Sequence, residues 1–146
     1  MTFGTLILSL QLISQSPQGI PYQAVARDLN GTPILNTSMS VRFTVHDGSG
    51  TGAIEFQETH TVTSNALGVF TVVIGGGDIT QGTFGGINWA DGLQFVQVEI
   101  DPTGGTNYLD MGVTQMFSVP YALYAANGGS TGPTGTAGAT GPSGVD

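Results

Sequence analysis

Residues 40–46, Ser-Val-Arg-Phe-Thr-Val-His, alternate between polar and apolar side chains at every step. Successive side chains of a β-strand point to opposite faces, so the alternation predicts a strand with Val41, Phe43 and Val45 on one face. We expect that face to be buried and the polar face to be solvated. A strand with one apolar face is stable only as part of a sheet that covers it.

Further segments rich in β-forming residues lie between clusters of turn residues. They are residues 22–27, 54–63, 69–74, 94–101, 108–111 and about 113–119, and residues 83–89 read as a loop that can contain one helical turn. Asn30-Gly31 is a strong hairpin-turn signal. The three glycines at 75–77 end the strand predicted at 69–74. About seven closely spaced strands without a long amphipathic helix predict an all-β protein, an antiparallel β-sandwich of the prealbumin or immunoglobulin type.

Glycine occupies every third position in six consecutive triplets at the end of the chain. These are Gly129, Gly132, Gly135, Gly138, Gly141 and Gly144, and Pro133 and Pro142 hold the second position of their triplets. Only glycine fits at the crowded axis of a collagen triple helix, so this phase predicts the start of a collagen-like stalk shared by three identical chains. A flexible Gly/Thr linker is the alternative. Asp146 ends a triplet, and we expect the natural chain to continue beyond it.

The N-terminus favours secretion. Residues 6–13 form an apolar run too short to span a bilayer, and the small polar residues Ser14-Gln15-Ser16 follow it. We expect a signal peptide at 1–16, although residues 1–5 contain no basic residue and a buried first strand is the alternative. We also leave open whether Met1 is the true start.

Composition narrows the possible partners. The chain of 146 residues has no cysteine, two basic residues and ten acidic ones, for a net charge of −8. A nucleic-acid-binding protein needs a basic face, and an anionic membrane surface attracts one, so we expect neither partner and no membrane insertion of the mature chain. With 8% charged residues and no lysine, the surface is mainly Thr, Ser, Asn, Gln and Gly, which favours a secreted or cell-surface protein.

Four domains follow from these patterns: the signal peptide at 1–16, a β-sandwich head at 17–119, a joining segment at 120–128 and the start of the stalk at 129–146. The residues expected to form the join, packed around a threefold axis, are Pro120, Tyr121, Ala122, Leu123, Tyr124 and Ala125.

Two groups of side chains could carry acid–base or transition-metal chemistry. His46 and His60 are the two histidines, and Glu58 is the best candidate to join His60 in a zinc or copper site. Glu99 and Asp101 lie two strand residues apart, about 6.5–7 Å between Cα atoms, a separation that a glycosidase can use. We expect exposed strand histidines and solvated outer-face carboxylates instead.

Asp101, Asn107 and Asp110 could bind calcium through oxygen atoms, but their spacing does not match a calcium-binding loop. We expect them to cap turns. Trp89 and Tyr108 are the candidates for an aromatic sugar platform, and we expect Trp89 to belong to the core or to cover the sandwich. With no catalytic motif elsewhere, we expect no enzyme activity and no cofactor.

Several stretches resemble known families. Residues 26–45 (ARDLNGTPILNTSMSVRFTV) and 63–75 (TSNALGVFTVVIG) resemble prealbumin-like modules of bacterial surface proteins. Residues 17–28 (PQGIPYQAVARD), 96–112 (VQVEIDPTGGTNYLDMG) and 118–125 (SVPYALYA) more strongly resemble secreted collagen-like or tail-fibre-like proteins of Bacteroidota-type bacteria. That resemblance implies a small β head joined to a stalk, with a structural or adhesive role. The alternative is a head that binds a surface glycan or a protein receptor.

Overall fold

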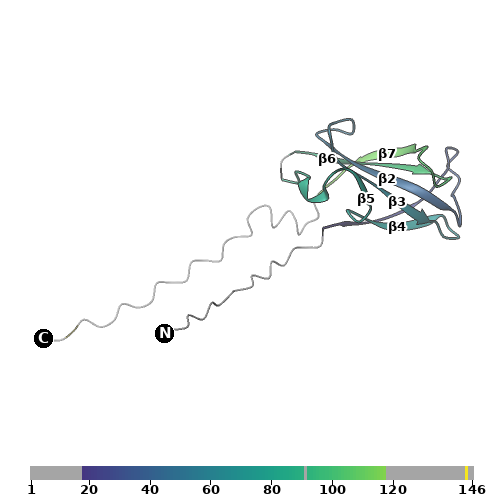
Figure 1. Ribbon diagram of the computed structural model, residues 1–146, viewed down its shortest axis with the longest axis horizontal. Coiled ribbons are helices and arrows are strands. Elements are labelled where there is room, and N and C mark those ends of the chain that lie inside the picture. The colour runs from purple at the N-terminus through teal and green to yellow at the C-terminus, as the bar shows by residue number, and fades with distance from the viewer. Residues whose placement is uncertain (1–17, 91, 118–143, 145–146) are drawn as a thin grey trace, which may run out of the picture. The chain divides into compact units, whose positions relative to one another are not determined.

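The computed structural model describes residues 18–90, 92–117 and 144 (Figure 1). Its elements are β1 (Ile20–Val25), β2 (Ser38–Asp47), β3 (Ile54–Thr63), β4 (Val69–Ile74), β5 (Asp78–Gly82), the 3-10 turn η1 (Phe84–Gly86), β6 (Gln94–Asp101) and β7 (Leu109–Gln115). They form a two-stranded sheet, β1-β4, and a five-stranded sheet in the order β5-β3-β2-β6-β7, with every pairing antiparallel. The predicted all-β fold with antiparallel sheets is confirmed, whereas the residues predicted to start a collagen-like stalk lie outside the described part except for Gly144.

The strand predictions were right where the apolar pattern was strong. β3, β4 and β6 have the predicted bounds, and β2 extends the predicted 40–46 by a few residues at its ends. β1 lies two residues earlier than predicted, because Ala26 and Arg27 turn into the next loop, where Arg27 bridges Pro33.

Two strand predictions were wrong at the edges of the larger sheet. β5 was missed because all five of its residues are exposed, so that it forms only by pairing with β3. One continuous strand, β7, replaces the two predicted at 108–111 and 113–119. Gly112 lies between the two predicted segments, and its φ of 121° is accommodated at a register shift in the pairing with β6. The number of strands is therefore as predicted, but their assignment differs.

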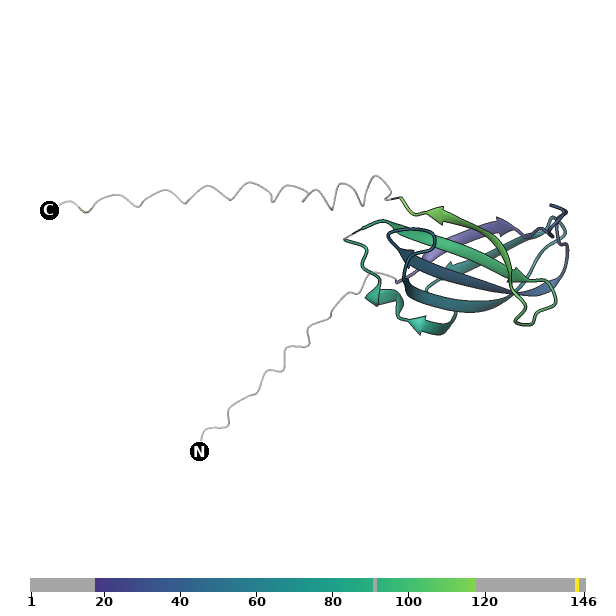
Figure 2. The same cartoon turned by 90° about the horizontal axis from the view of Figure 1, so that it is seen from above.

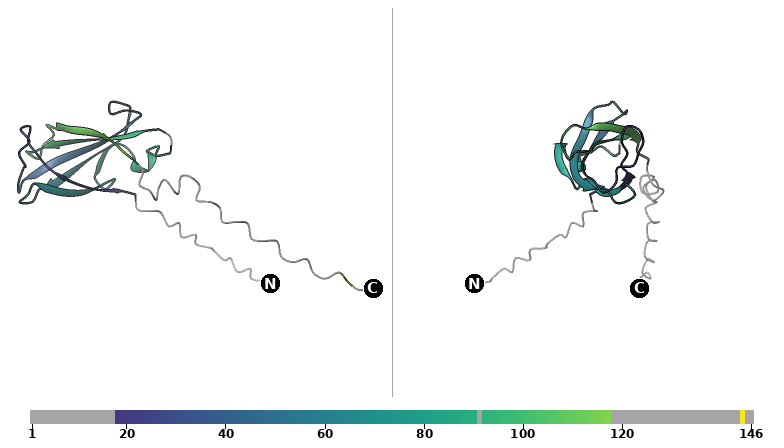
Figure 3. Two further views of the ribbon diagram at one scale, coloured as in Figure 1. Left: turned by 180° about the vertical axis from the view of Figure 1, so that it is seen from behind. Right: turned by 90° about the vertical axis from the view of Figure 1, so that its right-hand side faces the viewer.

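The core lies between the two sheets, which face each other in both views of Figure 3. Val41, Phe43 and Val45 are fully buried, as the alternation predicts. The other buried apolar residues are Ala26, Met39, Phe56, Phe70, Ile74, Ile87, Val96 and Ile100. Tyr22 of β1 packs edge-on against Phe43, with 5.0 Å between ring centroids.

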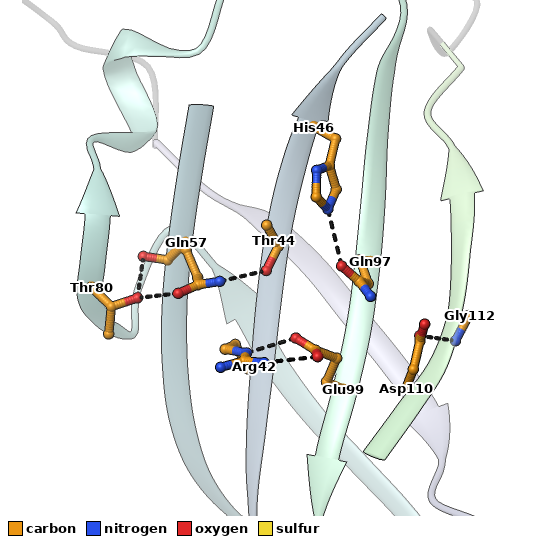
Figure 4. Close-up of polar contacts among 9 residues, drawn as sticks. All are labelled: Arg42, Thr44, His46, Gln57, Thr80, Gln97, Glu99, Asp110 and Gly112. Carbon is orange, nitrogen blue, oxygen red and sulfur yellow. Dashed lines mark hydrogen bonds and ion pairs between the residues drawn. The ribbon is translucent and has the colours of Figure 1, made fainter. Parts of the chain in front are cut away.

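The polar face of β2 is not solvated as expected. Thr44 and His46 are only 1% and 7% exposed, and Arg42 is half-buried. The reason is that β2 is the central strand, so long polar side chains of both neighbours lie over it. Gln57 of β3 donates a hydrogen bond to Thr44 Oγ1 (3.0 Å), and Gln97 of β6 lies 3.0 Å from His46 Nε2 (Figure 4).

The chain enters and leaves the sandwich at one end. Ile20, at the start of β1, lines the same cavity as Gln115 and Met116, at the end of β7. The loops 26–37, 64–68 and 102–108, here called the distal loops, lie at the other ends of these strands. No helix in the described part of the chain is long and apolar enough to cross a membrane.

Candidate functional site

A buried carboxylate occupies the interior of the sandwich. Glu58, on β3, is fully buried. Its Oε1 accepts a hydrogen bond from the Gly75 amide (2.9 Å) and lies 2.8 Å from His60 Nε2, and its Oε2 accepts one from the Gly77 amide (2.9 Å). Both oxygens therefore fasten the β4–β5 turn to β3, and we call this group of four residues the Glu58 clamp.

The predicted exposure of the two histidines was wrong. The His60 side chain is 12% exposed, and its ring stands edge-on to Phe43, with 5.7 Å between centroids. His46 lies on the outer face of the sheet, with Nδ1 3.0 Å from the Gly52 carbonyl. That carbonyl only accepts, so Nδ1 donates to it, and Nε2 lies 3.0 Å from Gln97 Oε1.

The histidines do not share a metal site. His46 and His60 lie on opposite faces of the sheet, because His60 pairs with inward-facing Val41, whereas His46 belongs to the outward-facing set. Among residues 18–90, 92–117 and 144, no group of three or more histidine and acidic side chains could hold a metal ion.

Arg42 and Glu99 form a bidentate ion pair across β2 and β6. The contacts are Nε to Oε2 at 2.6 Å and Nη2 to Oε1 at 2.8 Å (Figure 4). The hydrogen bonds with Glu99 raise the pKa of the Arg42 guanidinium further above its ordinary value. The guanidinium also lies 4.2 Å from the centre of the Tyr108 ring.

Asp101 caps the β6–β7 turn. It is 2% exposed. Its Oδ1 accepts hydrogen bonds from the Thr103 hydroxyl (2.7 Å) and amide (2.9 Å), and its Oδ2 accepts one from the Asn107 amide (2.8 Å). These bonds, the Thr103 hydroxyl first, lower the pKa of Asp101 below its ordinary value of 3.8. The predicted solvation of Glu99 and Asp101 was wrong, because Asp101 is bound within its turn and the Glu99 side chain, 12% exposed, is paired with Arg42. They are engaged separately and do not converge as a glycosidase pair.

Of the other candidate calcium ligands, Asp110 accepts a hydrogen bond from the Gly112 amide (2.8 Å). Asn107 contributes its backbone amide to Asp101. These contacts are the kind that turn capping requires.

Asp101→Asn should make the free energy of unfolding less dependent on pH. Because the folded-state pKa is lowered, the carboxylate contributes stability above its ordinary value of 3.8, and that contribution is lost as pH falls through the folded-state pKa. In urea unfolding, the variant should be less stable than the wild type at neutral pH, and the gap should narrow below pH 3.8. Asp78→Asn, at an exposed position, is the control. A gap that stays constant with pH would contradict this role.

The two candidate sugar-binding aromatics lie apart. Trp89 is 44% exposed, and its ring lies 5.7 Å from that of Phe84, so it partly covers the sandwich. Trp89 precedes the start of β6, whereas Tyr108 adjoins Leu109, which pairs near the end of β6. The two rings therefore do not form one platform. The residues predicted to form the join, 120–125, lie outside the described residues, as do the glycines of the predicted stalk other than Gly144.

Sequence reasoning missed two features. One is the Glu58 clamp, whose signal was an acidic residue on the same strand face as Phe56. The other is a pair of adjoining cavities, of about 380 and 270 Å³, which share Tyr22 and Val98 in their walls. Residues of β1, β6 and β7 line both cavities, and the course of these strands can be followed in Figure 2.

Comparisons place the sandwich within a family. No curated protein and no solved structure matches the chain. A family model described as a domain of unknown function, DUF8740, matches residues 21–116, which run from β1 to the residue after β7 and make up well over half of the chain. The chain therefore belongs to the DUF8740 family.

Proposed function

We propose that this chain is a secreted, non-catalytic fibre protein with a β-sandwich head on a homotrimeric collagen-like stalk. The observation that carries the proposal is the unbroken phase of six Gly-X-Y triplets from Gly129. A flexible linker has no need of that phase, whereas a triple helix requires it at every turn. The stalk follows soon after β7, the last strand of the sandwich.

The charged groups of the sandwich support a structural role. Glu58 holds a turn, Glu99 is paired with Arg42, and Asp101 caps the β6–β7 connection. General acid–base catalysis needs a carboxylate or imidazole free to exchange a proton with a substrate. These carboxylates are instead bound to partners within the fold, which favours a scaffold over a hydrolase.

A receptor-binding head is the second candidate, and one observation favours it. Leu29 and Leu67, in two of the distal loops, are 75% and 73% exposed. Asp28 Oδ1 accepts hydrogen bonds from two amides of the Leu29 loop, and Asn65 Oδ1 accepts from the amides on both sides of Gly68. Leucines held outward on ordered turns, at the end opposite the chain's entry and exit, suit contact with a protein better than with a glycan.

Gly138→Ala tests the stalk. A methyl group at the axis of a triple helix has no room, so the variant should lose collagen-type circular dichroism at a lower temperature than the wild type. Ala139→Ser, in the same triplet but away from the axis, is the matched control and should melt like the wild type. Identical melting of the glycine variant and the wild type would contradict the triple helix.

Secretion is tested on the exported protein. If residues 1–16 are a signal peptide, the mass of the exported chain should correspond to a start near Gln15. An intact Met1 on exported protein would contradict that part of the proposal.

A further inference from the structure

The sandwich is open along one side. β1 pairs only with β4, and β7 pairs only with β6, so each has a free edge among the described strands. The two adjoining cavities lie between these edges, with Ile20, Tyr22 and Ala24 of β1 on one wall and Thr114 of β7 on the other. We call this feature the β1–β7 groove.

The floor of the groove is an incompletely covered part of the core. Val41, Phe43 and Val45 of the central strand are fully buried, whereas the inward side chains of β1 and Val98 of β6 are only partly buried. Partial burial raises the pKa of the Tyr22 hydroxyl above its ordinary value of 10.0. Covering an apolar surface of this kind with a further side chain removes it from water, which lowers the free energy and favours binding.

Within the described part of the chain, the β1 wall carries backbone groups that no other strand pairs. The Ala26 amide bonds to the Gly68 carbonyl on the β4 side. Because backbone groups alternate in direction along a strand, those of Gln23 and Val25 point away from β4. Pro21 falls in the same outward set, where its missing N–H breaks no ladder bond.

The β7 wall also carries backbone groups that point away from its one described partner strand, β6. The Met116 amide bonds to the Gln94 carbonyl of β6, so by alternation the amides of Val113 and Gln115 point away from β6. Backbone N–H and C=O groups left free by the described strands on both walls, with an apolar floor between them, are complementary to one chemical form, an extended peptide.

We propose that the β1–β7 groove binds an extended segment of a separate, positively charged protein, which adds a strand to the sandwich. The strand edges supply backbone hydrogen bonds, and the floor takes an apolar side chain at every second residue. With six residues in β1 and seven in β7, the groove suits a segment of about that length.

Charge determines the choice of partner. The chain carries a net charge of −8, so a cationic segment is attracted to it from a distance. Arg27 and Asp28 are the charged residues that line the groove, and their charges balance. The selectivity for a basic segment therefore comes from the field of the whole protein and should weaken in salt. This binding does not depend on whether three chains share the stalk.

The test uses the full chain and a synthetic peptide, acetyl-Lys-Val-Thr-Val-Thr-Val-Lys-amide, in a calorimetric titration at low salt. We expect saturable binding. The same peptide N-methylated at alternate residues loses several backbone hydrogen bonds and should bind at least about tenfold more weakly. A version with glutamate in place of both lysines should also bind more weakly, and the difference should shrink at high salt.

Variants locate the binding. Thr114→Trp, which fills the groove from an exposed position, should weaken binding about tenfold or more, and Ile79→Trp on the opposite edge strand β5 is the control. Lack of any binding, or equal binding of the N-methylated peptide, would overturn the proposal. Slow hydrogen exchange at Val113 and Gln115 without peptide would also overturn it. It would mean that the chain fills its own groove or, if protection rises with concentration, that a second copy does.

Discussion

Phe43→Ala should lower the free energy of unfolding by about 3–5 kcal/mol, the usual cost of removing a buried phenylalanine ring. Phe43 is fully buried on the central strand, and the rings of Tyr22 and His60 both stand edge-on to it. The variant would leave a cavity that these neighbours cannot fill without moving β1 or β3. Urea unfolding followed by circular dichroism measures the loss.

Phe117→Ala is the matched control for this prediction. Phe117 is 78% exposed, so the same chemical change there should alter stability by less than about 0.5 kcal/mol. Similar losses for the two variants would contradict the burial of the β2 apolar face, on which the packing of the sandwich depends.

Glu58→Ala should be the most damaging change to a polar residue, at about 2–6 kcal/mol. It leaves the part-buried amides of Gly75 and Gly77 without their acceptor, and each orphaned donor that is shielded from water costs about 1–3 kcal/mol. We also expect faster hydrogen exchange at these two amides. Glu55→Ala removes a partly exposed carboxylate from the same strand and should cost well under about 1 kcal/mol. Equal effects of the two variants would contradict the clamp.

The fold was predictable where one strand face is apolar. The bounds of β3, β4 and β6 and the burial of Phe43 follow from local pattern, because burial on one face imposes a period of two. β5 was not predictable, because an exposed edge strand is held by its neighbour and carries no pattern of its own. Thr44 was missed for a related reason: its burial depends on Gln57, thirteen residues away in the sequence.

The polar groups were predictable as candidates but not in their roles. Turn capping by Asp101 uses partners within six residues and follows from turn chemistry. The partner of Glu99 is Arg42, fifty-seven residues away, so only the register of β2 against β6 brings them together. The β1–β7 groove depends on which strands lack a neighbour, and sheet order is not encoded in any single segment.

The molar mass of the wild-type chain in solution tests the central claim, that the head is carried on a stalk of three chains. The measurement is sedimentation equilibrium in the cold, with collagen-type circular dichroism recorded on the same sample. The account predicts three times the chain mass of 14.9 kDa together with the triple-helix signal. A monomer without that signal would reduce the glycine phase to a linker and contradict the proposed fibre.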